Sequence, residues 1–364
     1  MRAGEVGAMR VVAGFDAMVD TIARAVDVRR SPEDYAPMER IEQLGARIGG
    51  AAGKSINVEI AVERVKVGGN GAIMGEAMAR LGTRVTFLGN IGAHDGADAP
   101  AHEVFRAFAA ACERVVSLGE PGLTDALEFA DGKVMLGKTA ALGRITWDRV
   151  LERCGGAAGV GGVLDGAAVL APLSWTMVPG LDAIWDGLRA ALAALAPERR
   201  PRVMIDLADP AKRPPQDLRA ALERVRAIDA VAPVTLGLNL SESAHVARAL
   251  GAPAPTSLAE AAMSVREALG VACVATHSRE AAACATREGD AAAIDGWFTP
   301  TPRVSTGAGD HFNAGYALAW GLGLGAAERL ACACAVSGWY VRRGEGPSAQ
   351  ELGAFLERDG AGVA

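Results

Sequence analysis

The stretch 304–315 holds the residues best suited to chemistry. It reads Val-Ser-Thr-Gly-Ala-Gly-Asp-His-Phe-Asn-Ala-Gly. Gly307 and Gly309 lack side chains, so an anion could approach the backbone N–H groups closely. An apolar helical run follows from Phe312, and the start of a helix favours negative charge. An isolated Asp310 carboxylate would repel that anion. Asp310 is therefore expected to face a neutral hydroxyl, whose proton it could accept as the hydroxyl oxygen attacks phosphorus. The stretch therefore predicts phosphoryl transfer to an alcohol.

The same residues have a simpler interpretation. Aspartate after a small-residue turn is a common helix N-cap, because its carboxylate accepts bonds from the exposed N–H groups of the first turn. For residues 307–310 alone, capping is the more common outcome, since short glycine motifs are weak signals. The apolar segment Trp297–Val304 before the turn is predicted to be a strand. Other parts of the chain have to decide between the two interpretations.

A second glycine-rich element, Gly68-Gly69-Asn70-Gly71-Ala72, opens a predicted helix that ends near Gly82. Its strand, Gly-x-Gly and helix order also fits a dinucleotide-binding fold. That fold needs an acidic residue about 20 positions on, to bind the ribose. The chain has Gly89-Asn90 there. A dehydrogenase therefore stays an alternative, but the less favoured one.

Acidic and amide residues follow two predicted strands. Asp16 and Asp20 come after the strand that starts at Val11. Either could accept hydrogen bonds from a polyol or cap the next element, and Asp20 is favoured as the ligand-binding one. Asn239 and Glu242 stand between a strand and a helix, where they could hold hydrated Mg2+ beside phosphates. In the alternative, Ser241 of this segment is simply a helix N-cap.

Strand-like and helix-like segments alternate through most of the chain. This order predicts an α/β domain with a mainly parallel central sheet covered by helices on both faces, a three-layer α/β/α sandwich. Ligands of such sheets bind beyond the carboxyl ends of the strands. The predicted strands include Val85–Leu88, Ala168–Leu173, Val203–Leu207 and Val271–Thr276, and the helices His102–Cys112, Leu181–Leu195, Leu218–Ile228, Glu242–Leu250 and Leu258–Leu269, with three C-terminal pieces ending near Leu356.

Two segments break this alternation. Ser55–Val67 alternates apolar and polar residues, the pattern of a half-exposed strand. Leu127–Leu136 is typical of a hairpin, with Asp131-Gly132 as its two-residue turn. Both would belong to a small sheet outside the main fold, and their position beside the Gly68-Gly69 element favours a lid. We therefore expect one domain, residues 1–364, with lid segments at about 17–67 and 122–140 inserted.

Composition and charge argue against several classes of function. Half of the 364 residues are hydrophobic, and the net charge of −6 argues against a nucleic-acid partner, which requires a basic face. No apolar run approaches the ~20 residues of a membrane span, and Met1–Arg10 lacks the core of a signal peptide, so a cytoplasmic protein is expected. Six cysteines and five histidines show no Cys-x-x-Cys or His-x-x-x-His spacing, so no direct protein-built transition-metal site is expected.

These elements, in this order from Val11 to about Leu356, resemble the ribokinase-like family of sugar kinases, the phosphofructokinase-B type. The segments from Asp206 to Arg213 and at Arg343-Gly344 also look like family segments. The resemblance implies a ribokinase-like fold, with ATP and Mg2+ as cofactors. It implies these roles: Asp310 as catalytic base; Gly307, Ala308 and Gly309 as anion hole; Asp16, Asp20, Gly68, Gly69 and Asn70 at the substrate; Asn239, Glu242, Thr276, Ser278 and Gly344 at the nucleotide, Mg2+ or phosphate.

The chain departs from the family pattern in several places. Val304 stands where the family commonly has an aspartate that can help bind a monovalent cation, so dependence on such a cation is doubtful. The loop Gly89–Asp95 is one residue longer than usual, and the Thr276 segment lacks a common glycine. His277 could face phosphate, but a surface position is expected. The spacing of Asp16 and Asp20 differs from the ribose-specific pattern.

Taken together, the residues and the resemblance predict an ATP- and Mg2+-dependent kinase acting on a primary or similarly exposed hydroxyl of a sugar-like small molecule. A nucleoside kinase is the nearest alternative; nucleobases favour aromatic partners, and the chain is only 5% aromatic. A dehydrogenase and a non-catalytic sugar-binding protein are the others. The open edges and apolar surface of a small lid sheet would also suit a homodimer formed through two lids.

Overall fold

The computed structural model describes residues 3–92 and 101–359, and its main feature there is a nine-stranded sheet with the order β14-β13-β12-β11-β10-β9-β1-β5-β6. The strands from β12 to β6 run parallel, and β13 and β14 are antiparallel additions at one edge. The strands are β1 (Arg10–Phe15), β5 (Arg84–Gly89), β6 (Arg114–Ser117), β9 (Val169–Pro172), β10 (Arg202–Asp206), β11 (Val234–Asn239), β12 (Cys273–His277), β13 (Ala281–Thr286) and β14 (Ala291–Asp295).

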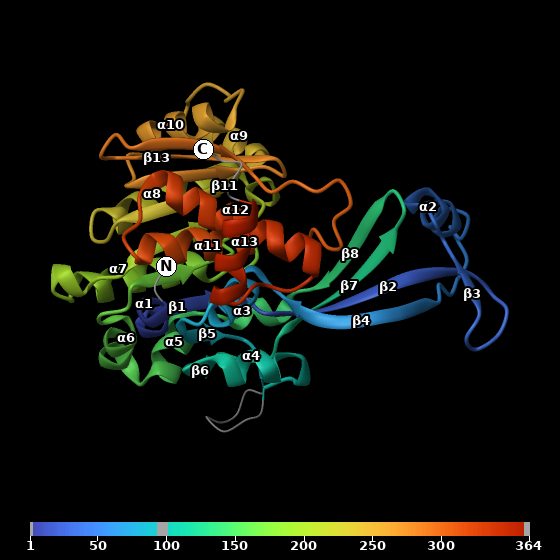
Figure 1. Ribbon diagram of the computed structural model, residues 1–364. Coiled ribbons are helices and arrows are strands. Elements are labelled where there is room, and N and C mark those ends of the chain that lie inside the picture. The colour runs from blue at the N-terminus through green and yellow to red at the C-terminus, as the bar shows by residue number, and fades with distance from the viewer. Residues whose placement is uncertain (1–2, 93–100, 360–364) are drawn as a thin grey trace.

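Helices cover both faces of this sheet (Figure 1). Along β1, Val11 and Ala13 join one apolar cluster and Val12 joins another, because successive strand residues point to opposite faces. The first cluster includes α1 (Ala3–Ala8), α3 (Asn70–Arg80), α4 (Arg106–Ala111), α11 (Ala308–Gly321), α12 (Ala326–Arg343) and α13 (Ala349–Asp359). The second includes α5 (Trp147–Cys154), α6 (Gly156–Leu164), α7 (Leu181–Ala193), α8 (Pro215–Asp229), α9 (Leu240–Ala249) and α10 (Leu258–Leu269). The predicted three-layer α/β/α sandwich is confirmed.

A separate five-stranded sheet projects from the side of this body (Figure 1). Its order is β3-β2-β7-β8, with β4 also paired to β2. The strands are β2 (Met18–Arg29), β3 (Tyr35–Pro37), β4 (Ile60–Gly68), β7 (Gly122–Phe129) and β8 (Gly132–Lys138). Helix α2 (Ile41–Gly49) packs on its far end, where Leu44 joins a small core with Ala23 and Leu127. We call this unit the small sheet.

Short 3-10 turns complete the chain, at Glu103–Phe105, Ala140–Arg144, Pro197–Arg199 and Pro210–Lys212. The first of these precedes α4, so the predicted helix His102–Cys112 is a 3-10 turn followed by an α-helix. In the described part of the chain, no helix combines the length and the apolar character needed to cross a membrane. Residues 93–95 of the loop expected to be one residue longer lie outside the described residues.

Three local predictions are wrong. Residues 55–59 form no strand, because the β2–β4 ladder starts at the pair Ala25 and Ile60, and beyond it β2 pairs with β3. Residues 297–304 are irregular, since Pro300 and Pro302 have no N–H to donate to a ladder. The hairpin turn is Ala130-Asp131, one residue earlier than expected, because Phe129 pairs with Gly132.

The topology brings the polar ends of several strands to one edge. Asp16 follows β1, and Asp206, Asn239 and His277 end β10, β11 and β12. Because parallel strands share the direction of their carboxyl ends, these residues lie at the same edge of the main sheet. The first turns of α3 and α11 face this edge, and the small sheet begins there at β2. The arrangement gathers the candidate site residues from distant parts of the sequence.

Candidate active site

Asp310 lies in the first turn of α11 and is 6% exposed. Gly307, with a φ of 94°, is the N-cap of that helix, a left-handed conformation that favours glycine. The Asp310 carboxylate therefore does not cap α11, and the capping interpretation is wrong. Within the described residues, its Oδ1 is buried and has no hydrogen-bond partner. Because buried polar atoms are normally paired, an orphaned carboxylate oxygen marks a place for a ligand.

The charges around Asp310 make its ionisation costly. Burial, then the carboxylates of Asp206 and Asp16, raise the pKa of Asp310 well above its usual value. A hydrogen bond from the Asn70 side chain and the charge of Lys66 act in the opposite direction. A carboxylate with a raised pKa is a better proton acceptor than an exposed one. This electrostatic setting suits a general base.

Free backbone donors adjoin that carboxylate. The N–H of Ala308 is engaged by the Ser305 carbonyl at 3.2 Å. In the described part of the chain, the N–H groups of Gly309 and Asp310 meet no acceptor, as usual for the first turn of a helix. The turn Gly307–Gly309 thus offers donors to an anion where the helix dipole is favourable.

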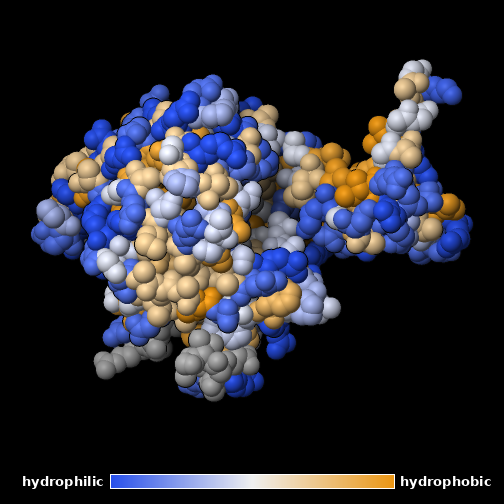
Figure 2. All heavy atoms as spheres, turned by 90° about the horizontal axis from the view of Figure 1, so that it is seen from above, coloured by the Kyte–Doolittle hydropathy of each residue, from blue (hydrophilic) through white to orange (hydrophobic). Residues whose placement is uncertain are grey.

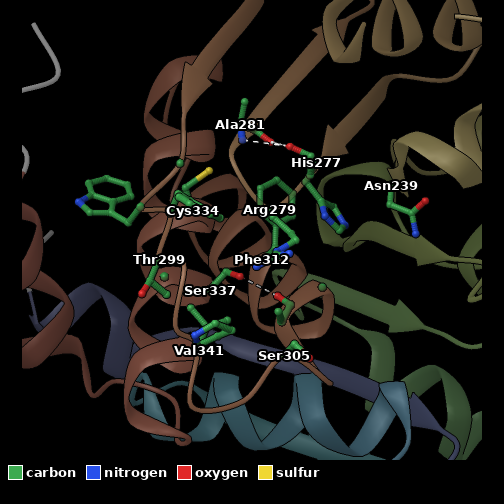
Figure 3. Close-up of a pocket in the computed structure, with 18 residues that line it drawn as sticks. Asn239, His277, Arg279, Ala281, Thr299, Ser305, Phe312, Cys334, Ser337 and Val341 are labelled. Atoms are coloured by element: carbon green, nitrogen blue, oxygen red, sulfur yellow. Dashed lines mark hydrogen bonds between the residues drawn. The ribbon is translucent and has the colours of Figure 1, made fainter. Parts of the chain in front are cut away.

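A cavity of about 270 Å³ ends at this turn (Figure 3). Of the residues predicted to contact nucleotide, Asn239 and Ser278 line it. Most of its wall could not be predicted from the sequence, because Trp297–Val304 resembles a strand and α12 carries no recognisable motif. The other lining residues are His277, Arg279, Ala281, Gly296, Trp297, Phe298, Thr299, Pro302, Ser305, Ala308, Gly309, Phe312, Cys334, Ser337, Gly338 and Val341.

His277 is not the surface residue that was expected. Its ring lines the cavity beside Gly309 and lies 4.7 Å from the ring of Phe312, centroid to centroid. Burial lowers the pKa of His277 to about 4, so the ring is neutral near pH 7. It can therefore offer one donor and one acceptor to a nucleotide, but no positive charge.

Two residues assigned to the nucleotide lie elsewhere. Thr276 is fully buried, and its hydroxyl lies 2.8 Å from the Leu258 carbonyl oxygen, so it holds α10 to the sheet. Gly344 ends α12 in a left-handed conformation, with its N–H donating to the Tyr340 carbonyl at 2.7 Å. Neither lines the cavity. Both have structural roles that the resemblance alone did not separate from ligand binding.

Asn239 and Glu242 form a reciprocal cap on α9. The Glu242 N–H donates to Asn239 Oδ1 and the Asn239 N–H to Glu242 Oε2, both at 2.9 Å. Asn239, not Ser241, is therefore the N-cap. Burial and the nearby carboxylate of Asp206 raise the pKa of Glu242 to about 8. Two adjacent carboxylates without a counter-charge fit a hydrated cation, although no cluster of three His, Cys, Asp or Glu side chains lies in the described residues.

Asp16 has a structural role, because its carboxylate holds the start of α3. Its two carboxylate oxygens accept the N–H groups of Asn70, at 2.9 Å, and Gly71, at 2.8 Å, at the start of α3. Burial raises the pKa of Asp16 to about 6. The capping alternative weighed for the two aspartates thus describes Asp16. Gly69, the N-cap residue of α3, and Asn70 are brought beside it.

Asp20 lies on β2 and is 5% exposed, next to Gly68. A Cβ on Gly68 would lie 2.3 Å from Asp20 Oδ2, so only glycine lets the carboxylate sit there. Burial raises the pKa of Asp20, while Lys66 and a hydrogen bond with Thr124 lower it. Asp20 therefore remains available to a polyol in a way that Asp16 does not.

Several site residues were missed by sequence reasoning. Asp206 accepts a 2.7 Å hydrogen bond from Asn313, one turn after Asp310 on α11, and Ser174 lies 3.3 Å from the Asn70 side-chain oxygen. Asp206 begins a segment that resembles the family, but the sequence assigned no role to its side chain. Lys66 already falls within the period-2 segment Ser55–Val67, but that pattern alone assigned it no role. Asn313 and Ser174 carried no such signal.

A second cleft, of about 400 Å³, separates the small sheet from the segment 302–306. Pro302 and Ser305 line both this cleft and the first cavity, so their segment is the wall between the two. Basic side chains predominate in the second cleft, namely Arg64, Lys66, Lys133 and Arg303. The site therefore has two compartments that meet at Pro302 and Ser305, one beside the main sheet and one beneath the small sheet.

Comparisons with known proteins point to one family. A family model described as prokaryotic ketohexokinase matches residues 3–359. The ketohexokinase of Haloferax volcanii is 32% identical over 348 residues, which cover 95% of this chain and 90% of that protein.

Solved structures show the same architecture. Ribokinase from Thermotoga maritima superposes with a TM-score of 0.62 at 17% identity, covering 96% of this chain and 99% of that one. Phosphofructokinase-2 from Escherichia coli in complex with fructose-6-phosphate gives a TM-score of 0.62 at 17% identity, with the same two coverages, 96% and 99%. At these identities the likeness establishes the fold, and the predicted ribokinase-like fold is confirmed.

Proposed function

The chain belongs to the prokaryotic ketohexokinase family, and from this premise we propose that it transfers the terminal phosphoryl group of ATP to a primary hydroxyl of a ketohexose. It is a carbohydrate kinase that uses ATP, which sets aside the dehydrogenase and the non-catalytic binding protein. The ketohexose comes from the name of the Haloferax volcanii relative. The observation that carries the proposal is the orphaned, buried Oδ1 of Asp310 beside the free N–H groups of its helix.

Asp310 is the proposed base. It would accept the proton of the sugar hydroxyl as that oxygen attacks phosphorus. The turn Gly307–Gly309 would stabilise negative charge on the transferred phosphoryl group with the free N–H groups at the start of α11. Asp20 and the Asn70 side chain would bind sugar hydroxyls, while Asp16 holds the start of α3 in place.

Mg2+ fits the acidic edge formed by Asp206 and Glu242. Burial and the Asp206 carboxylate raise the pKa of Glu242 to about 8, so a bound cation beside these two groups would favour the ionised form. Because Mg2+ keeps several waters, these carboxylates and Asn239 would hold it through water. When bound, the ion screens the charge of the triphosphate.

We propose that the small sheet, segments 17–67 and 122–140 of a single domain, is a lid. Its Lys66 and Lys133 line the same cleft as Ser305 and Thr306 of the main body, so closure would exclude water from the acceptor side. A closed site limits wasteful hydrolysis of ATP.

The outer surface of the lid supports a homodimer. Several of its large apolar side chains are exposed, and Figure 2 shows hydrophobic atoms gathered on the projecting arm. They include Ile60, Val62, Val65, Leu123 and Leu136, which are 39–59% exposed. Covering such side chains against a second lid would be favourable.

We also propose a cytoplasmic location. The six free thiols suit the reducing cytoplasm, in which ATP is abundant.

A nucleoside kinase remains the alternative within this fold. The second cleft contributes one aromatic side chain, Phe129, and that ring also belongs to the core of the small sheet. A nucleobase would thus lack a free stacking partner, which favours a plain sugar.

The test is an ADP-release assay with ATP and Mg2+ over ketohexoses, aldohexoses, sugar acids and nucleosides. We expect a ketohexose to give the highest kcat/KM. Preference for an aldohexose or sugar acid would overturn the substrate but keep the kinase, and preference for a nucleoside would favour the alternative. A binding-defective control, Asp20→Ala, should raise KM for the sugar while ATP still binds.

A further inference from the structure

Side chains of two helices hold the turn at the start of α11. The carbonyl groups of Thr306, Gly307 and Ala308 follow one another along the chain, and each accepts a hydrogen bond from a side chain. The Tyr340 hydroxyl donates to the Thr306 carbonyl at 2.7 Å, and the Ser337 hydroxyl donates to the Ala308 carbonyl at 2.9 Å (Figure 3). The two donors are three residues apart on α12, so one face of that helix supports the turn.

His311 on α11 supplies the third donor, to the Gly307 carbonyl. Its Nδ1 lies 2.8 Å from that oxygen. A carbonyl oxygen can only accept, so Nδ1 carries a proton. The His311 ring stacks on the Tyr340 ring, with 3.6 Å between the ring centroids and 14° between the planes. Both side chains are buried, being 4% and 5% exposed, so the stacked pair has a fixed place beside the turn.

Fixing these carbonyl groups also fixes the N–H groups of the turn. The peptide bonds here are planar and trans, so each carbonyl points away from the N–H of the next residue. The Tyr340 bond thereby orients the N–H of Gly307, and the Ser337 bond orients the N–H of Gly309. Within the described residues, neither of these N–H groups meets an acceptor. Donors that are oriented in advance need no rearrangement when charge develops on a ligand, so they stabilise that charge well.

Tyr340 and His311 contact the turn from outside the cavities. A Cβ on Gly307 would lie only 3.0 Å from the Tyr340 hydroxyl oxygen, so that hydroxyl packs against the turn. Neither ring lines the cavity beside the main sheet or the cleft beneath the small sheet, whereas Ser337 lines the first of these. Tyr340 and His311 can therefore affect a phosphate in the site only through the backbone of the turn.

We propose that Tyr340, Ser337 and His311 are positioning residues that hold the turn Gly307–Gly309 in the conformation that binds the transferred phosphoryl group. The inference rests on the proposed function, in which this turn is the anion hole. The charge at the turn is greatest in the transition state, so the three hydrogen bonds should matter more for turnover than for binding of ATP or sugar. Losing such an interaction lowers kcat and leaves KM unchanged.

The experiment compares Tyr340→Phe and Ser337→Ala with the wild type, using the best sugar from the substrate panel. We expect kcat to fall roughly tenfold in each variant, less than the ~10²–10³-fold effect of losing an anion-hole donor itself. Both KM values should stay within about twofold of the wild type. Calorimetry gives a second readout. Affinity for ADP with Mg2+, sugar and aluminium fluoride, which mimics the transferred group, should fall about as much as kcat, while affinity for ADP alone should not.

Tyr316→Phe is the matched control. Tyr316 is a fully buried tyrosine of α11, and its hydroxyl lies 3.1 Å from Cys273 Sγ. The control loses a buried hydroxyl but no hydrogen bond to the turn, so its thermal unfolding midpoint should fall while kcat stays close to the wild-type value. At His311, asparagine can place an amide nitrogen near the position of Nδ1. His311→Asn should therefore retain more of the wild-type kcat than His311→Leu.

Three results would overturn the inference. The first is a wild-type kcat in both Tyr340→Phe and Ser337→Ala. The second is a raised KM for ATP with unchanged kcat, which would mean that these residues only shape the nucleotide cavity. The third is an equal loss of kcat in Tyr316→Phe, which would indicate a general effect of lost packing. All three leave the proposed function intact, since the wild type still releases ADP with a ketohexose. A wild type that releases no ADP with any sugar would remove the proposed function, and this inference with it.

Discussion

Lys133 Nζ, on strand β8 of the small sheet, donates a 2.7 Å hydrogen bond to Thr306 Oγ1, immediately before the turn Gly307–Gly309. The Thr306 carbonyl accepts a second hydrogen bond, also of 2.7 Å, from the Tyr340 hydroxyl on α12. Thr306 is thus tied to both the small sheet and the main body. The contact joins residues 173 positions apart, and it connects the small sheet, the proposed lid, to the proposed anion-binding turn.

Breaking this contact should weaken sugar binding. Because Lys133 is partly exposed, with 34% of its side-chain surface accessible, the bond should contribute about 1 kcal/mol, or roughly a fivefold rise in KM for the sugar in Lys133→Ala. The KM for ATP should change little. Steady-state kinetics of Lys133→Ala, Thr306→Val and the double variant would measure the coupling. Fully additive effects on KM would contradict a linkage between the two residues.

The free energy of unfolding should depend on pH because of Asp16. Burial raises its pKa from 3.8 to about 6, so the folded chain binds this proton more tightly than the unfolded chain. Asp16 therefore contributes stability below about pH 4 that is lost as the pH rises through about 6, up to roughly 3 kcal/mol. Urea unfolding should show the wild type losing stability relative to Asp16→Asn between these values. A pH-independent difference between the two proteins would be incompatible with this environment.

Turnover should not depend on a monovalent cation. Val304 offers an apolar side chain where related kinases commonly have a carboxylate, and its N–H is taken up by the Val341 carbonyl at 3.3 Å. Replacing K+ by tetramethylammonium at constant ionic strength should leave kcat and both KM values unchanged. Strong activation by K+ would mean that other oxygen ligands form such a site.

The oligomeric state should depend on the exposed face of the small sheet. Val62→Asp together with Leu136→Asp places two charges on side chains that are 59% and 47% exposed. We expect the wild type to elute as a dimer in size-exclusion chromatography with light scattering, and the double variant as a 37.3 kDa monomer. Met263→Asp, at an exposed apolar position on α10, is the control and should remain dimeric. A monomeric wild type would refute the lid-mediated dimer.

The sequence predicts the sandwich well, because buried parallel strands and amphipathic helices leave strong periodic signals. It also identifies Asp310, Gly307 and Asp20 as candidates, since glycine turns and acidic strand ends have direct chemical meaning. The sequence-based prediction fails where tertiary packing determines the direction in which a side chain points. Thr276 and His277 are adjacent on β12, yet one faces a carbonyl inside the fold and the other a cavity.

Other failures have the same origin. Lys66 lies opposite Asp20 only because β4 pairs with β2, and the sequence pattern did not fix the register of that pairing. Asp16 and Asp20 look equivalent in the chain, but the start of α3 takes both oxygens of Asp16 and leaves Asp20 free of such bonds. Such distinctions depend on tertiary pairing, which local periodicity does not encode.

The central claim is that Asp310 is the base of a sugar kinase, and one measurement tests it most directly. Asp310→Asn keeps the size of the side chain but removes its ability to accept the proton. ATP binding measured by calorimetry and the thermal unfolding midpoint should remain close to those of the wild type, while ADP release with a ketohexose should fall by roughly 10²–10⁴-fold. Turnover near the wild-type rate in this folded, ATP-binding variant would contradict the account.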